Sequence, residues 1–306
     1  MLDRESTFAD PEIVSSLKND FVPVAIDQAY QRRQKDTEGE FYRGIVQQSP
    51  RKDFGDGTTQ GLYTASPDGT FLGFSNNRGP ERIQAMLKKA LADFRPVDSE
   101  PVTATQTDAR FHPELPFGGL VIRVRAKVLG GYEETDDPWQ RIFQSAVSRD
   151  NLWLTAAEHR ELIQGTIPDR VKTRISRYHL VDNTRGEPPM WQADEVRSMR
   201  LEIEPAEPDS QSRTIVGDFH LETLDGARGF TGTIRGVLEH DGQHVTRCDF
   251  VAKGEFRGEG RFTGHAPAGR FPFAVSFELA DQSDIADQIP PQASRGWIDG
   301  YWRVAE

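Results

Sequence analysis

A histidine stands between two carboxylates at alternate positions in the C-terminal half of the chain. Asp218, His220 and Glu222 alternate with apolar residues inside an expected strand, 213–224, so they share one face with roughly 7 Å between neighbours. Such a set can ligate a metal ion or act as an acid/base pair. A solvated strand face explains the same pattern, and we favour that interpretation. In a closed barrel, the polar face would instead line a cavity.

Two further histidines, His240 and His244, flank an expected hairpin loop. Imidazoles facing each other across a short loop can share a metal ion, but we favour exposed loop histidines. The apolar faces of the two strands match if Ile234 lies opposite Phe250. That register predicts a three-residue loop or a bulge at 241–243.

Cys248 is the only cysteine of the chain. A single cysteine excludes an internal disulfide, a Cys-x-x-Cys pair and a zinc site with several thiolates. Alternation along the strand 245–256 places Cys248 inward and Arg247 on the opposite face, and no helix N-terminus is evident nearby to lower the thiol pKa. We interpret Cys248 as a buried, inert thiol.

Other signatures of chemistry are absent from the sequence. The segment 258–264 is rich in glycine, but its spacing differs from that of a dinucleotide loop and strands surround it, so it is interpreted as bends in a curled sheet. The chain has no Gly-x-Ser-x-Gly, no His-Glu-x-x-His and no P-loop. The sequence therefore predicts no catalytic residue and no cofactor.

The amino-acid composition restricts the classes of partner that the protein can bind. The 306 residues include 37 Lys and Arg and 48 Asp and Glu, for a net charge of −11, so the chain lacks the basic character of nucleic-acid-binding proteins. No apolar run approaches the ~18 residues of a membrane span. The first residues are charged where a signal peptide is apolar. The sequence as written thus predicts a cytoplasmic location, whereas a start upstream of Met1 would allow export.

The spacing of apolar residues and the positions of the turn-forming residues predict an α+β protein with two domains. An N-terminal domain of residues 1–95 is followed by a linker, 96–113, rich in Pro, Ser, Thr and Asp, and by a β-rich domain, 114–306. In that second domain, Thr155 and Glu158 form a capping-box pattern before a helix. Short strands with turns between them favour an antiparallel sandwich or barrel, with strands at 120–128, 174–181, 196–203, 213–224, 230–239, 245–256 and 271–279. The aromatic residues Trp297, Tyr301 and Trp302 are interpreted as part of a terminal strand.

The first domain has a clear order of elements. Asp10 and Pro11 begin a helix, and the apolar run 21–27 follows as a strand covered on both faces. A second helix within 34–48 leads to a hairpin around the turn Ser66-Pro67-Asp68-Gly69. The apolar face of the helix that begins at Pro80 is expected to pack on a sheet.

This order resembles a thioredoxin fold without its first strand. The sequence is similar to the thioredoxin-like family in which a Cys-x-x-Cys-His-x-Met stretch runs into a Glu-Ser-Phe helix and a Phe-Val-Pro strand. The resemblance covers about the first third of the chain. The matching residues are Met1, Glu5-Ser6-Thr7-Phe8, Asp10, Glu12-Ile13, Phe21-Val22-Pro23-Val24 and Ile26-Asp27.

Both halves of the family's redox site are missing. The family's cysteines precede the residue that matches Met1, and Gln60 or Gly61 stands where the family has a proline. Two explanations remain open. The domain is a degenerate binding scaffold, or the gene start is placed too late and omits a strand with a Cys-x-x-Cys or selenocysteine motif. The missing strand would be central to the parallel sheet.

These observations leave three functional hypotheses. The first is a thioredoxin-like domain without redox cysteines, fused to a β-rich domain that binds a protein or small-molecule ligand, with no catalytic activity. The alternative is a thiol–disulfide oxidoreductase whose catalytic residues lie upstream of Met1. In the third, the β-rich domain serves assembly and the first domain is a docking surface.

Overall fold

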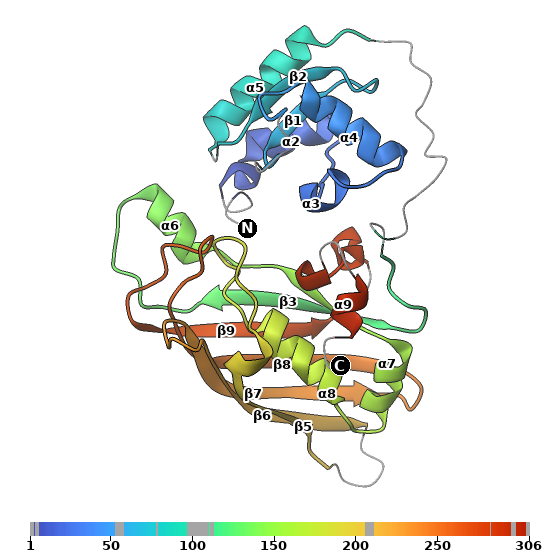
Figure 1. The fold of residues 1–306 in the computed structure, drawn as a ribbon, viewed down its shortest axis with the longest axis vertical. Coiled ribbons are helices and arrows are strands. Elements are labelled where there is room, and N and C mark those ends of the chain that lie inside the picture. Colours follow the sequence, from blue (N-terminus) through green and yellow to red (C-terminus); the bar gives the residue numbers. More distant parts are fainter. Residues whose placement is uncertain are drawn as a thin grey trace. The chain divides into compact units, whose positions relative to one another are not determined.

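The computed structural model describes residues 3, 6–52, 58–77, 79–96, 110, 113–205, 211–281, 283–294 and 298–303. The chain forms two compact units, Asp3–Pro113 and Glu114–Glu306 (Figure 1). Both helices and strands are present, so the fold class is α+β. Most of the expected linker 96–113 lies outside the described residues.

The N-terminal unit begins as its local signals predict. The Asp10 carboxylate accepts the backbone N–H groups of Glu12 and Ile13, both at 3.0 Å, which confirms the predicted helix start. The second helix and the hairpin are also confirmed. The elements are η1 (Thr7–Ala9), α2 (Pro11–Asp20), α3 (Gln28–Gln31), α4 (Thr37–Gln47), β1 (Leu62–Ala65), β2 (Phe71–Ser75) and α5 (Pro80–Asp93).

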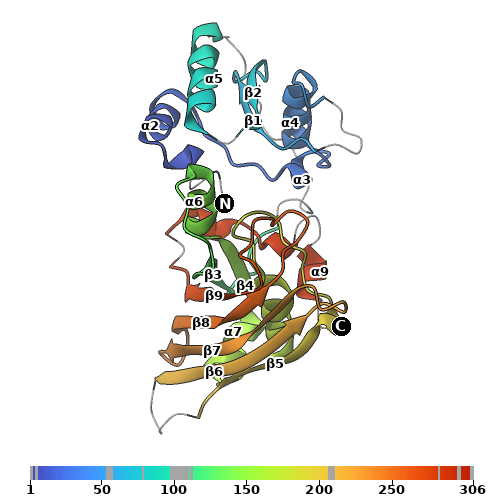
Figure 2. The same ribbon diagram turned by 90° about the vertical axis from the view of Figure 1, so that its left-hand side faces the viewer.

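Helices cover both faces of the β1–β2 hairpin. Ile13 of α2 and Ile83 and Leu87 of α5 form a buried cluster against which Leu62 packs. On the other face, the Tyr63 ring lies 6.4 Å from the ring of Tyr42 of α4. Figure 2 shows the hairpin between α2 and α5 on one side and α4 on the other. The unit is thus a helix–sheet–helix sandwich around two strands.

The predicted strand 21–27 is wrong. Phe21–Asp27 is not part of any sheet, because the described residues provide no strand beside it. Three of its apolar side chains are exposed to solvent: Val22 is 89% exposed, Val24 72% and Ile26 44%. Val22–Ile26, an apolar run that suits a strand with cover on both faces, therefore lies at the surface with no strand partner among the described residues.

The C-terminal unit is built on one antiparallel sheet of seven strands, in the order β4-β3-β9-β8-β7-β6-β5. Of the two expected architectures, a sandwich or a barrel, this single curled sheet corresponds to part of a barrel. Its strands are β3 (Leu120–Val128), β4 (Asp150–Leu154), β5 (Val196–Ile203), β6 (Ser212–Glu222), β7 (Gly229–His240), β8 (Val245–Arg257) and β9 (Arg270–Leu279). The other elements are α6 (Pro138–Ser145), α7 (Ala156–Ile163), α8 (Asp169–Arg174), η2 (Ile175–His179), η3 (Ala193–Glu195), η4 (Ile285–Gln288), η5 (Gln292–Ser294) and α9 (Ile298–Trp302).

The β7–β8 hairpin keeps the predicted apolar face but not the predicted register. Ile234 lies opposite Ala252, two residues from the expected Phe250, and a bulge falls between Glu239 and His240. A shift by two residues preserves which side chains point inward. A bulge is therefore present, but it lies before the loop and not at 241–243 as predicted.

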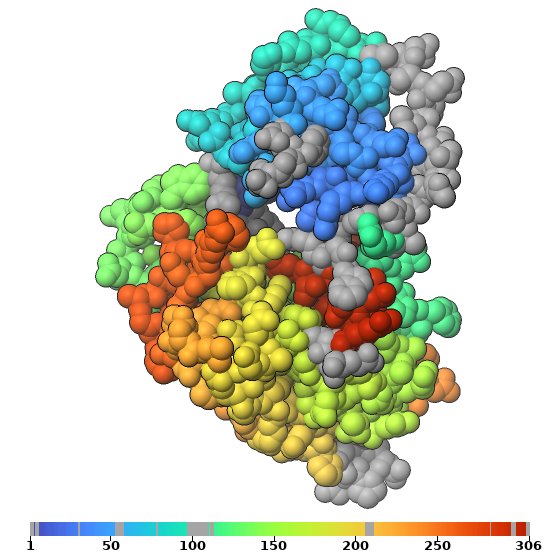
Figure 3. Space-filling model, in the orientation of Figure 1, coloured from blue at the N-terminus to red at the C-terminus, as the bar shows by residue number. Residues whose placement is uncertain are grey.

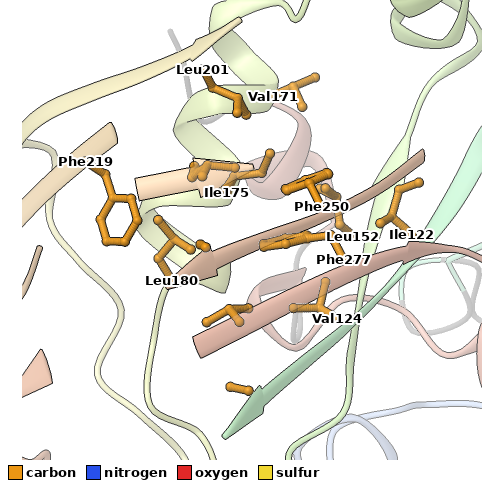
Figure 4. Close-up of a cluster of buried hydrophobic side chains, with 14 of the residues drawn as sticks. Ile122, Val124, Leu152, Val171, Ile175, Leu180, Leu201, Phe219, Phe250 and Phe277 are labelled. Atoms are coloured by element: carbon orange, nitrogen blue, oxygen red, sulfur yellow. The ribbon is translucent and has the colours of Figure 1, made fainter. Parts of the chain in front are cut away.

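The concave face of the sheet holds the core. Phe230, Phe256, Phe273 and Phe277 are buried there. The segment of α7, α8 and η2, yellow-green in Figures 1 and 3, lies over this face. Figure 4 shows Val171, Ile175 and Leu180 of that segment among the side chains of the strands.

Glycines permit the curl of the sheet. Gly232 and Gly254 lie opposite each other on the inward face of β7 and β8. A Cβ on Gly232 would collide with the carbonyl of Lys253, and one on Gly254 with the carbonyl of Thr231. Only glycine allows the strands to bend this closely. The bends thus lie within the strands rather than at 258–264, which forms the loop after β8.

Two other expected strands are helical. Residues 174–179 fall in α8 and the π-helical turn η2, and Tyr301 and Trp302 belong to α9. Trp297 lies outside the described residues. The predicted helix after Thr155 is confirmed as α7, with Thr155 and Glu158 in a complete capping box.

Candidate functional site

The structure places Asp218, His220 and Glu222 on the outer face of β6, away from the core. Asp218 pairs with Arg200 at 2.7 Å, Glu222 pairs with Arg257, and His220 is exposed between them. Because their arginine partners occupy both carboxylates, the three residues form a solvated, charge-paired surface.

His240 and His244 are each held by neighbours in their own loop. His240 Nδ1 accepts the N–H of Gly242 at 3.2 Å, and His244 Nδ1 lies 3.7 Å from Asp241 Oδ2. Among the described residues, no three His, Cys, Asp or Glu side chains gather as a metal ion would require.

Cys248 points into the core, as predicted. It lies opposite Leu238 and is buried. Burial raises the pKa of the Cys248 thiol to about 12, with a smaller contribution from the charge of Asp249. At neutral pH the sulfur is therefore a protonated thiol without access to solvent.

A buried polar chain, not predicted from the sequence, joins three elements of the C-terminal unit. His179 of η2 has Nδ1 3.1 Å from Asp150 Oδ2 and Nε2 3.2 Å from the Tyr301 hydroxyl. That hydroxyl also accepts the N–H of Trp153 at 3.3 Å. Asp150, His179 and Tyr301 are all buried. They are far apart in sequence, so no spacing pattern could have linked them.

The order of Asp150, His179 and Tyr301 resembles a proton relay, but the burial of these side chains indicates a structural role. Burial raises the pKa of Tyr301, so its hydroxyl stays protonated. Arg174 packs against the Tyr301 ring and pairs with Glu158 of α7. The buried polar groups thus fasten α7, η2 and α9 to the β4 side of the sheet.

The same edge of the sheet is held from its outer side. Asp287 of η4, itself buried, pairs with Arg123 of β3 at 2.7 Å and with Arg149 at 2.9 Å. The hydrogen bonds from Arg123 lower the pKa of Asp287, so the carboxylate stays charged. The amide of Asn151 donates to the carbonyls of Ala286 and Ile289, both at 2.8 Å. The C-terminal segment therefore covers the β4 edge.

The N-terminal unit presents a different kind of site, which we call the open edge: Phe21–Asp27 together with the edge of β1 that β2 does not occupy. Within the described residues, neither Val22–Ile26 nor that side of β1 has a backbone hydrogen bond to another element. Unpaired strand backbone is a template for another strand. The open edge is thus suited to pairing with a strand of another polypeptide.

Contacts at both ends hold Phe21–Asp27 near β1. Phe21 packs on the buried cluster that Leu62 also contacts. At the other end, the Thr59 hydroxyl, just before β1, donates to the side-chain oxygen of Gln28 at 2.8 Å. Two fixed ends keep the extended segment in place without a neighbouring strand.

Comparison with known proteins provides no identification: no family model, curated protein or solved structure matches the chain. Within the described ranges, none of the helices combines the length and the apolar character needed to cross a bilayer.

If the buried chain fastens α9, replacing Tyr301 by Phe should destabilise the C-terminal unit by about 1–3 kcal/mol, because the N–H of Trp153 and His179 Nε2 both lose a partner. Urea unfolding measures the difference. The control is Tyr178→Phe, whose ring stacks on Tyr301 and which should change stability by less than about 0.5 kcal/mol. Equal effects of the two substitutions would show that the hydroxyl of Tyr301 has no structural role.

Proposed function

We propose that this chain is a binding protein with a thioredoxin-like N-terminal domain that carries no redox site and a β-rich C-terminal domain. The observation that carries the proposal is the exposed apolar segment Phe21–Asp27, with Val22, Val24 and Ile26 in solvent. Apolar surface in water costs roughly 25 cal/mol per Å². A contiguous patch of this kind is typical of an interaction site.

The layers of the N-terminal unit support the thioredoxin-like assignment. Its order is helix, extended segment, helix, hairpin and helix, with helices on both faces of the hairpin. This is the order of a thioredoxin fold without the first strand. At Gly61, one of the two positions where the family has a proline, a Cβ would collide with the Phe74 ring. The departure from the family is thus compatible with local packing.

The state of Cys248 supports a function other than thiol chemistry. Disulfide exchange requires a thiolate with access to its target. Cys248 lies in the core of the other unit, and burial raises its pKa to about 12. A binding role is therefore the better account of the thioredoxin-like domain in this chain.

Binding of a neutral apolar dye tests the interaction surface. Val22→Asp/Val24→Asp should lower Nile red fluorescence on the protein by more than half, since two outward apolar side chains become charged. Both residues are exposed, so folding should be unaffected. The control is Leu224→Asp in the C-terminal unit, where Leu224 is 71% exposed and Val24 72%. If both proteins bound the dye as wild type does, Phe21–Asp27 would not be an interaction surface.

Thiol chemistry is tested directly on the purified chain. It should reduce insulin disulfides no faster than a Cys248→Ala variant does, and Cys248 should react with Ellman's reagent only after guanidinium unfolding, because the native thiol is buried and protonated. Reduction that depended on Cys248, or rapid labelling of the native protein, would contradict this part of the proposal.

A second candidate is the thiol–disulfide oxidoreductase that the resemblance implies, with its dithiol encoded before Met1. The open edge favours it too, since a preceding strand would find an unpaired partner there. The genomic DNA before Met1 decides: an in-frame Cys-x-x-Cys or TGA codon supports this candidate, and an in-frame stop without either excludes it.

A further inference from the structure

The backbone at the open edge is available for strand pairing. Within the described residues, Val22–Ile26 pairs with no strand, and the backbone of β1 pairs with β2 alone. Peptides commonly bind such edges by adding a strand, with main-chain hydrogen bonds providing affinity and side-chain contacts providing specificity. An incoming strand that pairs with β1 would also cover the apolar side chains of Val22, Val24 and Ile26.

The layers around β1 define the composition of such a strand. Leu62 faces the cluster of α2 and α5, and Tyr63 faces Tyr42 of α4. A strand beside β1 would therefore have helices over both of its faces. Strands with cover on both faces are apolar at consecutive positions rather than at alternate ones. The ligand should thus be a short, continuous apolar run of about five residues, the usual length of a strand.

The N-terminal unit lacks the core that such a strand would complete. Of the forty-two buried apolar residues in the described chain, only six lie in this unit. These are Ile13, Tyr42, Val46, Ile83, Leu87 and Ala90. A domain of this size usually needs a larger buried core. An added apolar strand would supply the missing burial.

Charge indicates the ends of the ligand and its source. The chain is acidic, with a net charge of −11, so an incoming strand with basic residues at its ends would be favoured over an acidic one. Two copies of this chain, each with a net charge of −11, repel each other at long range. Both features favour a separate, basic-flanked polypeptide over a second copy.

We propose that the open edge binds an extended apolar segment of another polypeptide, which adds as a strand to β1 and covers Val22, Val24 and Ile26. This inference rests on the proposed binding function and gives its partner a chemical class: a β-strand-forming peptide with a continuous apolar run, without proline and with basic ends. Binding would extend the two-stranded hairpin and bury the exposed segment.

Selection from random nonapeptides displayed on phage tests the proposal. Wild-type protein should enrich peptides with at least four consecutive apolar residues, no proline in that run and Lys or Arg at the ends. Val22→Asp/Val24→Asp should bind the selected peptides at least about tenfold more weakly, and Leu224→Asp should bind them as wild type does. N-methylation of alternate residues in a selected peptide should also weaken binding by about tenfold, because it removes strand donors.

Several outcomes would overturn the proposal. One is a selection that enriches no peptide above background, and another is a selection that enriches peptides without an apolar run. A third is a selection that enriches peptides that the Val22→Asp/Val24→Asp variant binds as well as wild type does. Light scattering that shows a wild-type dimer, converted to monomer by the same variant, would assign the site to a second copy instead. The Nile red comparison distinguishes this proposal from the proposed binding function. If the dye binds at Val22 and Val24 but no strand-forming peptide is selected, the binding function is retained and strand addition is rejected.

Discussion

Backbone hydrogen bonding at the edge of a sheet is the constraint on which this structure depends. A strand edge presents a row of N–H and C=O groups that must be paired, covered or left to attract another strand. The C-terminal unit covers its β4 edge with its own terminal segment, through Asn151, Tyr301 and Asp287. In the described part of the N-terminal unit, Val22–Ile26 and the edge of β1 opposite β2 have no backbone partner. The difference separates a covered strand edge from one suited to binding.

The buried polar groups of the C-terminal unit follow from this constraint. Helix α9 is short, so propensity alone would not hold it in place. Its Tyr301 hydroxyl satisfies an edge N–H and reaches His179. A chain of aspartate, histidine and tyrosine suggests catalysis when seen as a set of residue types. Its burial and its position between the sheet edge and three helices show instead how the edge is closed.

Local signals in the sequence were reliable, and non-local ones were not. The Asp10 cap, the hairpin turn and the capping box at Thr155 depend on a few adjacent residues, and all were predicted. The segment 174–181 was misinterpreted as a strand. The buried apolar residues Val171, Ile175 and Leu180 in and next to this segment are spaced by four and then five, because η2 is a π-helical turn that interrupts the helical period.

The candidate site could be predicted only in part. The sequence identified Phe21–Asp27 as an apolar run, but a strand needs a partner, and the pattern of one segment does not show whether that partner exists. The inward position of Cys248 followed from alternation. Asp150, His179 and Tyr301 could not be linked, because curling of the sheet and packing of helices bring them together.

Hydrogen exchange of the backbone amides in the purified chain tests the central claim most directly. If the open edge is unpaired, the amides of Val22 and Val24–Ile26 should exchange about as fast as those of an unstructured peptide, while the amides within β7 and β8 are protected. Slow exchange at Val22 and Val24–Ile26 in the chain alone would show that these residues already have strand partners, and would contradict the account.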